Sequence, residues 1–310
     1  MSEIKQLTTD ILVIGGGAAG IAVAANSARA GRSVVLVDRR AYLGGILPQC
    51  IHHGFGLGVY GEDLTGPEYL ERQLEGFRSS GATYIASATV LEVSQDRYAT
   101  ISSSDGLCQI HFEHCVLATG CRERTLYSLG VAGTRPQGIY TAGEAQELIN
   151  LAHQDIGNRI FILGSGDIGQ IMARRFSLLG KTVVGIAEIR SELGGIKRNR
   201  EECIEAFNIP VLLNSTITEV RGYPTLTGAT VRHIDSGANE FIECDTLITA
   251  LGLIPDRSLA EPLAKDGKYP SWLHFCGNAN YVHEIVDTVT SEGMRLGATL
   301  RTNTDIFQKV

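Results

Sequence analysis

Short runs of apolar residues alternate with polar, glycine-containing segments along most of the chain. The first run, residues 11–14, is too short for a buried helix and stops at a cluster of glycines. An alanine-rich segment then continues to Gly31, and a second apolar run covers residues 33–37. This pattern predicts a strand, a glycine loop, a helix and a second strand, which together make a βαβ unit.

The glycine loop has the spacing G-x-G-x-x-G, which is typical of a dinucleotide site. Gly15 permits the tight turn, Gly17 lets the backbone approach a pyrophosphate, and Gly20 lets the helix pack close to the strand. The helix N-terminus then faces the negative charge, and an acid after the second strand holds a ribose hydroxyl. The predicted contacts of this first site are Gly15, Gly17, Ala18, Ala19, Gly20, Asp38 and Arg39.

A second copy of the pattern begins with the apolar run 159–163 and continues through a helix to Leu179 and a strand over 182–187. Two fingerprints predict two bound dinucleotides. Its predicted contacts are Gly164, Gly166, Asp167, Ile168, Gly169 and Glu188. Because a carboxylate repels a 2′-phosphate, Glu188 favours NAD(H) over NADP(H). A basic cluster close by either binds such a phosphate or is a solvated surface: Arg190, Lys197, Arg198 and Arg200.

The remaining segments predict short strands and two further helices. The helices cover 68–79 and 284–299, and the strands cover 84–86, 89–93, 98–101, 109–112, 115–120, 209–213, 216–220, 230–234, 241–243, 246–252 and 273–278. The strands 115–120 and 246–252 both end at a glycine, and we expect the chain to leave and re-enter the first domain there. The predicted domains are therefore 1–121 with 246–310, and 122–245.

Composition narrows the class of partner. A net charge of −7 and a pI near 5.6 argue against nucleic acid or an anionic membrane as the partner. The N-terminus lacks a basic-then-apolar signal and no apolar stretch approaches about 18 residues, so we expect a cytoplasmic protein without membrane insertion. The seven scattered cysteines contain no C-x-x-C, and the eight histidines no H-E-x-x-H, so neither a disulfide framework nor a metal site is predicted.

The order of motifs over essentially the whole chain resembles the two-dinucleotide-binding flavoproteins, specifically the low-molecular-weight thioredoxin reductase branch. The motifs are the first fingerprint, Gly44-Gly45, residues 64–68, Ala118-Thr119-Gly120, the second fingerprint, Ala250-Leu251-Gly252 and Cys276-Gly277-Asn278. The resemblance implies an α/β fold with two Rossmann-like domains and a discontinuous FAD domain. It implies FAD at the first fingerprint and a nicotinamide nucleotide at the second. It adds these residues to the FAD site: Gly45, Val90, Thr119, Gly120, Gly277 and Asn278.

Segments 45–52, 120–125 and 133–143 are similar to a narrower group, the NAD(P)/FAD-dependent oxidoreductases that accompany glycerol-3-phosphate-dehydrogenase-like flavoproteins. Two departures from the thioredoxin reductases matter. The region before the second fingerprint, residues 138–144, lacks the redox C-x-x-C, and the aspartate expected after Gly277 is Asn278. The chain therefore lacks the pair of cysteines that dithiol–disulfide exchange needs. The Asn278 amide can still form hydrogen bonds with ribityl hydroxyls.

Cys50 is the single cysteine in the loop expected near the flavin, and His52 and His53 stand close enough in sequence to lower its pKa. Either Cys50 contributes a thiolate, or it is a buried and inert cysteine. His52 is a candidate proton donor to reduced flavin or substrate.

These features predict an FAD-dependent oxidoreductase that transfers hydride between NAD(H) and FAD without a redox disulfide. By resemblance, electrons continue to a partner flavoprotein or small redox protein. Direct chemistry on a small-molecule acceptor at the flavin and a non-catalytic nucleotide-binding regulator are the alternatives, and the sequence leaves a homodimer open.

Overall fold

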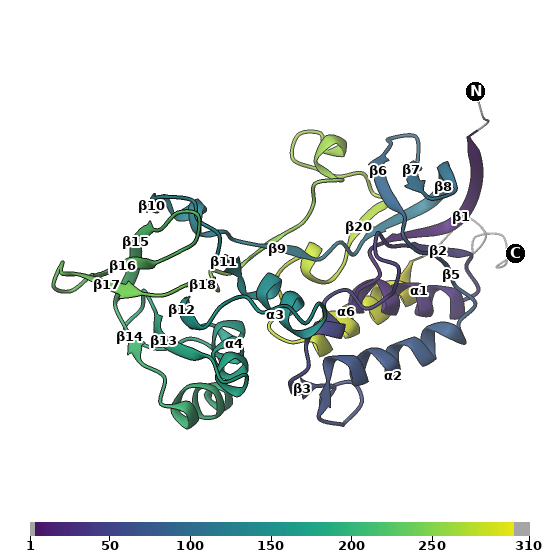
Figure 1. Ribbon diagram of the computed structural model, residues 1–310. Helices are drawn as coiled ribbons and strands as arrows, with labels where there is room; N and C mark the ends of the chain where they lie inside the picture. Colours follow the sequence, from purple (N-terminus) through teal and green to yellow (C-terminus); the bar gives the residue numbers. More distant parts are fainter. Residues whose placement is uncertain (1–3, 301–310) are drawn as a thin grey trace, which may run out of the picture. The chain divides into compact units, whose positions relative to one another are not determined.

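The computed structural model describes residues 4–300, and the chain divides into two compact units (Figure 1). The first unit contains the residues up to Arg122 and those from Pro255 onward, and the second contains Glu123–Ile254. Each unit has its own parallel sheet with helices packed on it, so the predicted α/β class is confirmed.

The first unit is built on a seven-stranded sheet of order β5-β2-β1-β8-β7-β6, with β20 on β8. Its strands are β1 (Lys5–Ile14), β2 (Val34–Val37), β5 (Thr83–Ile85), β6 (Thr89–Val93), β7 (Tyr98–Ser103), β8 (Gly106–Leu117) and β20 (Leu273–Phe275). The pairs among β5, β2, β1, β8 and β20 are parallel, and β6 and β7 form an antiparallel edge. The central strands are apolar without alternation because both faces of the sheet are covered.

Three helices cover one face of this sheet (Figure 1): α1 (Ala18–Arg29), α2 (Gly66–Arg78) and α6 (Val286–Thr299). A Cβ on Gly293 would lie 2.7 Å from the Ala19 carbonyl oxygen, and one on Gly297 2.6 Å from that of Val23. The two glycines therefore let α6 pack close against α1, and this places the turn before α6 beside the first fingerprint. Along the chain, β2 and α2 are separated by η1 (Leu47–Gln49) and by two short paired strands, β3 (His53–Phe55) and β4 (Leu64–Thr65).

The second unit has a five-stranded parallel sheet of order β11-β18-β12-β13-β14. Its strands are β11 (Ile139–Thr141), β12 (Arg159–Leu163), β13 (Thr182–Ala187), β14 (Val211–Leu212) and β18 (Thr246–Thr249). The helices α3 (Ala142–Asn150) and α4 (Asp167–Leu178) share a core with the sheet, and helical turns continue over α5 (Lys197–Asn199), η3 (Arg200–Ile204) and η4 (Glu205–Phe207). A second sheet has the order β10 (Ala132–Gly133), β15 (Ser215–Arg221), β16 (Gly228–His233) and β17 (Asn239–Glu243).

Two short strands, β9 (Cys121–Glu123) and β19 (Leu253–Pro255), pair where the chain passes from one unit to the other. The second crossing lies at 254/255, nine residues after the position expected from the sequence. The reason is the pairing of β18 with β11 and β12, which keeps residues 246–249 in the second unit.

Element boundaries differ from the sequence expectations at a few places. The expected strands 109–112 and 115–120 are one strand, β8, and β1 begins at Lys5, before the apolar run. Helix α3 is short and was not expected from apolar periodicity. Its start is set by a capping box, in which Thr141 accepts from the N–H of Glu144 and the Glu144 carboxylate accepts from the N–H of Thr141.

Candidate dinucleotide sites

The first fingerprint loop requires glycine at two of its positions. Gly15 has φ +105°, and a Cβ there would lie 2.4 Å from the Ala118 carbonyl oxygen. A Cβ on Gly20 would lie 1.8 Å from the carbonyl oxygen of Gly15. The loop therefore turns tightly from β1 into α1, packs against Ala118 after β8, and brings α1 close to the end of β1, as the spacing predicts.

The N-terminus of α1 is left open for an anion. Gly17 is the N-cap, no side chain caps the helix, and its first turn contains no acidic residue. The N–H groups of Ala18, Ala19 and Gly20 precede the first intrahelical bond, which runs from Ile21 to Gly17. A Cβ on Gly17 would have only the Cα of Gly45, 3.9 Å away, within 4 Å. Open space and unsatisfied N–H groups fit a pyrophosphate at this loop.

Asp38 lies beside the same loop with acceptor capacity to spare. Its Oδ2 accepts from the N–H of Gly16 at 2.6 Å, and its Oδ1 accepts from the N–H of Arg40 at 2.7 Å. A carboxylate has about four lone-pair positions, so about two stay available for the hydroxyls of a ribose. The neighbouring Arg39 is exposed.

The other residues predicted for the first site lie in three places. Gly45 and Gly277 pack against the fingerprint, since a Cβ on Gly45 would lie 3.1 Å from the Cα of Gly17 and one on Gly277 2.7 Å from the Cβ of Ala19. Thr119 and Gly120 follow β8, and the Thr119 hydroxyl donates to the carbonyl of Asp256 at 2.6 Å. Val90 packs on the core at the other face of the sheet.

Asn278 is held by its neighbours in the turn before α6. Its Oδ1 accepts from the backbone N–H of His283 at 3.0 Å, and its Nδ2 lies 3.6 Å from the Sγ of Cys121. The Glu292 carboxylate fixes the same turn by accepting from the N–H of Gly277 at 2.9 Å and from the Asn280 amide at 2.7 Å.

The structure differs from the expectation that His52 and His53 lower the pKa of Cys50. Cys50 is buried, and its desolvation raises the pKa of the thiol to about 12. The thiol donates to the carbonyl of Ile46 at 3.3 Å. The Nδ1 of His52 lies 3.0 Å from the carbonyl oxygen of His53, and the Nδ1 of His53 lies 3.2 Å from that of Asp63. Burial therefore favours the inert thiol over the thiolate.

The second fingerprint repeats the geometry of the first. Gly164 has φ +100°, and a Cβ there would lie 2.3 Å from the carbonyl oxygen of Ala250. One on Gly169 would lie 2.4 Å from the carbonyl oxygen of Gly164. Gly166 is an N-cap without a capping side chain, and a Cβ there would meet nothing within 4 Å. The loop and the start of α4 therefore fit a second pyrophosphate.

Asp167 has a structural contact that its position in the motif did not predict. Its Oδ1 accepts from the N–H of Ile196 and from the Asn199 amide, each at 2.8 Å. The side chain of this first α4 residue therefore holds the loop before α5. Ile168 packs on the core of the second unit.

Glu188 is buried beside the second fingerprint loop. It is hydrogen-bonded to Ser165, a partner that the sequence did not indicate. Its Oε2 accepts from the backbone N–H of Ser165 at 3.0 Å and from the Ser165 hydroxyl. Its Oε1 accepts from the backbone N–H and the Nε of Arg190, each at 3.1 Å. Desolvation alone would raise the pKa of Glu188, but these bonds hold it below the ordinary value.

The same four-residue motif, Leu-Gly-Gly-Ile, occurs after the acid of each site. Leu43-Gly44-Gly45-Ile46 and Leu193-Gly194-Gly195-Ile196 place their first glycine six residues after Asp38 and after Glu188, respectively. In the first unit the N–H of Gly44 donates to the carbonyl of Gly16 at 2.7 Å. In the second, the N–H of Gly194 donates to the Ser165 hydroxyl at 2.8 Å. Both segments thus lie over a fingerprint loop.

Much of the basic cluster after Glu188 is paired on the surface. Lys197 and Glu201 lie 3.4 Å apart, and Arg198 and Glu202 2.9 Å apart, both as i,i+4 pairs. Arg200 donates to the carbonyl of Leu193 at 3.2 Å. Arg190 is the member of the cluster that contacts Glu188.

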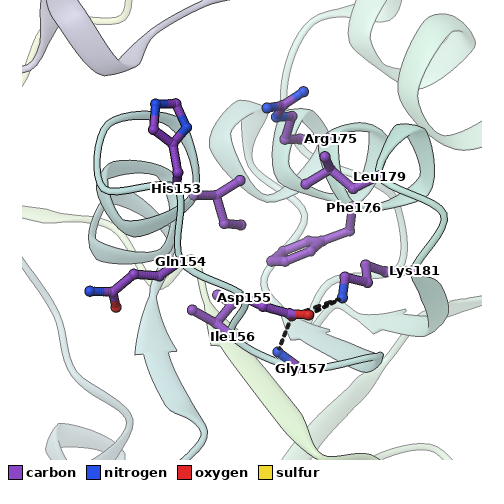
Figure 2. A pocket seen from close by; sticks show the side chains of 10 residues that line it. His153, Gln154, Asp155, Ile156, Gly157, Arg175, Phe176, Leu179 and Lys181 are labelled. Atoms are coloured by element: carbon purple, nitrogen blue, oxygen red, sulfur yellow. Dashed lines mark hydrogen bonds and ion pairs between the residues drawn. The ribbon is translucent and has the colours of Figure 1, made fainter.

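A pocket of about 310 Å³ lies elsewhere in the second unit (Figure 2). Its lining includes the buried apolar side chains of Phe176 and Ile149. Lys181 and Asp155, which also line it, form an ion pair 2.8 Å apart (Figure 2). It is next to the start of β12 and β13, whereas the fingerprint follows the end of β12. The pocket is therefore separate from the predicted dinucleotide site.

Residues 4–300 contain neither a metal-binding cluster nor a membrane-spanning helix. No group of three or more His, Cys, Asp or Glu side chains in this part of the chain is arranged to hold a metal ion. None of the helices in the same range is long and apolar enough to cross a membrane.

Several known proteins are similar to this chain in sequence. The chain is 23% identical to a thioredoxin reductase of Treponema pallidum over 83% of its length and 80% of the relative's. It is 26% identical to the sarcosine oxidase subunit alpha of a Corynebacterium species over 82% of its length, but spans only 25% of that subunit. It is also 26% identical to hydrogen cyanide synthase subunit HcnB of Pseudomonas aeruginosa, over 70% of this chain and 45% of that one.

The crystal structure of the T. acidophilum thioredoxin reductase matches 94% of this chain and 96% of its own, with a TM-score of 0.75 and 20% identity. This match confirms the predicted thioredoxin reductase-like fold. The family model described as pyridine nucleotide-disulphide oxidoreductase matches residues 9–269. The chain therefore belongs to the pyridine nucleotide-disulphide oxidoreductase family and is an FAD-dependent NAD(P)H oxidoreductase.

Proposed function

We propose that this protein binds FAD at Gly15–Gly20, binds NAD(H) at Gly164–Gly169, and passes electrons between them and on to an acceptor without a redox-active disulfide. The observation that carries the proposal is the repetition of one loop geometry in both units. In each, a positive-φ glycine packs under an alanine carbonyl, Ala118 or Ala250, and an uncapped helix follows.

FAD fits the residues of the first site. The N-terminus of α1 would bind the pyrophosphate, and Asp38 has acceptor positions for the adenosine ribose. By the family resemblance, Thr119, Gly277 and Asn278 would contact the rest of the FAD. Bound FAD supplies the hydride acceptor, and the protein supplies position and exclusion of water. His52 stays a candidate proton donor, whereas the buried Cys50 thiol supports transfer without a thiolate.

The acceptor we propose is a partner flavoprotein or small redox protein, with a small-molecule acceptor as the alternative. Two relatives are named as subunits, and this chain spans 25% and 45% of their lengths. A partner subunit therefore agrees with those relatives, and a homodimer and a cytoplasmic location are further expectations. The similarity to proteins that accompany glycerol-3-phosphate-dehydrogenase-like flavoproteins stays a prediction.

Anaerobic mixing with NADH tests the proposal. The purified yellow protein should bleach as NADH is oxidised, and denaturation should release FAD and no FMN. Turnover of a small acceptor at the bleaching rate would identify a stand-alone enzyme, whereas slow turnover accelerated by an added partner would identify a subunit. A flavin that stays oxidised under excess NADH and NADPH would contradict the proposal and indicate a nucleotide-binding regulator.

A further inference from the structure

Asp38 and Glu188, the acids proposed to hold the two riboses, differ in how many hydrogen-bond acceptor positions they have left. Asp38 receives two backbone N–H groups and keeps about half of its lone-pair positions. Glu188 receives four donors, two from Ser165 and two from Arg190, which fill about all of its positions. As the second site stands, no acceptor position is left for a ribose hydroxyl.

Three of the four donors on Glu188 are fixed. Two are backbone N–H groups, and the Ser165 hydroxyl is oriented by the N–H of Gly194, which it accepts at 2.8 Å. Ser165 is also completely buried. The fourth donor, the Nε of Arg190, belongs to a side chain that is 58% exposed, so it is the group that can leave.

The position of the Arg190 guanidinium suits a phosphate. The guanidinium lies over Gly194. A Cβ on Gly194 would lie 2.2 Å from the Nη2 of Arg190, so the guanidinium occupies space that only glycine leaves at this position. Its bond to Glu188 uses Nε and offsets the carboxylate charge, while the Nη groups make no hydrogen bond within residues 4–300. A guanidinium with free N–H groups binds phosphate oxygens in a bidentate manner.

We propose that Arg190 is the specificity gate of the second dinucleotide site. In the position seen in the structure, the Arg190 guanidinium is bonded to Glu188 and offers its Nη groups to a 2′-phosphate. When it swings away, Glu188 regains the acceptor positions that a ribose diol needs. The site therefore accepts both NAD(H) and NADP(H), and Arg190 sets the ratio between them. This inference rests on the proposed assignment of the second fingerprint to a nicotinamide nucleotide.

Titration calorimetry of the FAD-loaded protein with NAD⁺ and NADP⁺, without reductant, tests the gate by affinity alone. We expect wild type to bind both, with Kd values within about tenfold of each other. Arg190→Ala should bind NAD⁺ more tightly and NADP⁺ more weakly, so the ratio shifts by about tenfold or more toward NAD⁺, the size expected for losing one charge-assisted bond. Arg190→Lys keeps the charge and should shift the ratio less.

Arg198→Ala is the matched control, because it removes an arginine of the same surface that pairs with Glu202. It should leave both Kd values within about twofold of wild type. An unchanged ratio in Arg190→Ala would overturn the gate while the proposed function stands. Failure of the wild type to bind either dinucleotide would overturn both.

Discussion

Ser165 donates both its backbone N–H and its hydroxyl to a single oxygen of Glu188. The serine is the variable residue between the first two glycines of the fingerprint, and the acid ends the next strand. Their hydrogen bonds join the loop after β12 to the end of β13 through one buried carboxylate. In the first unit Gly16 takes the same place with its N–H alone, because a Cβ there would lie 2.5 Å from the Leu43 side chain.

Glu188→Gln should weaken the second site and leave the first intact. The amide replaces one acceptor oxygen by a donor, so an N–H of Ser165 or Arg190 loses its partner at a buried position. We expect the affinity for NAD⁺ to fall by about tenfold and that for NADP⁺ to fall less, because Arg190 is released. Calorimetry gives the two Kd values, and the flavin absorbance of the same sample is the internal control. An unchanged Kd for NAD⁺ would remove the role assigned to Glu188.

Gly17→Ala and Gly166→Ala form a matched pair that separates the two dinucleotides. Neither added methyl group meets a protein atom closer than 3.9 Å, and neither glycine has a positive φ, so both variants should fold. Each methyl group would instead block the close approach of a pyrophosphate. Gly17→Ala should purify with less than about a tenth of the wild-type flavin. Gly166→Ala should stay yellow and bind NAD⁺ about tenfold more weakly. Loss of flavin from the second variant would reverse the assignment of the sites.

The local sequence was sufficient to predict the strand, loop and helix pattern of both sites. Apolar runs of four or five residues next to spaced glycines leave few alternatives, and the close contacts at Gly15 and Gly164 show why those glycines are needed. The boundary between the two units at 254/255 was harder to predict from the sequence, because it depends on the sheet to which residues 246–249 belong. That pairing joins strands about a hundred residues apart in sequence, so local patterns do not determine it.

Side-chain partners were the least predictable part. His52 and His53 follow Cys50 in sequence, yet burial raises the pKa of the thiol, and Gly66 at the start of α2 lies against the Cys50 side chain. Asp167 stands where a motif predicts a ligand contact, but its carboxylate bonds a loop about thirty residues later. In both cases the tertiary neighbour determines the chemistry of the side chain.

Cys50→Ser tests whether this cysteine takes part in electron transfer. Because the pKa of the thiol is raised to about 12, it is protonated at neutral pH and donates to Ile46. We expect the rate of flavin reduction by NADH in anaerobic stopped flow to stay within about twofold of wild type. Iodoacetamide should modify Cys50 far faster in urea than in the folded protein. A collapse of the reduction rate with normal flavin content would identify a catalytic thiol.

His274 should make the first unit less stable in mild acid. Its Nε2 lies 3.1 Å from the Nδ1 of His114, and burial together with this neighbour lowers the pKa of His274 to about 4. Below about pH 6.5 the unfolded chain binds a proton on this ring that the folded chain refuses until about pH 4. Stability is therefore lost as the pH falls through this window, by about 2 kcal/mol once partial exposure of the ring is allowed for.

Urea unfolding between pH 7 and pH 4 measures this loss through the fluorescence of Trp272, the chain's single tryptophan, whose ring lies 5.5 Å from that of Phe112 in the same unit. In His274→Asn the pH dependence should be shallower by the same amount, because the acids that titrate in this window are common to both proteins. His111→Asn is the matched control, because it removes a histidine of the same strand β8 that lies outside the His114–His274 pair. Equal slopes in wild type and His274→Asn would show that the histidine pair does not contribute to the acid sensitivity of the first unit.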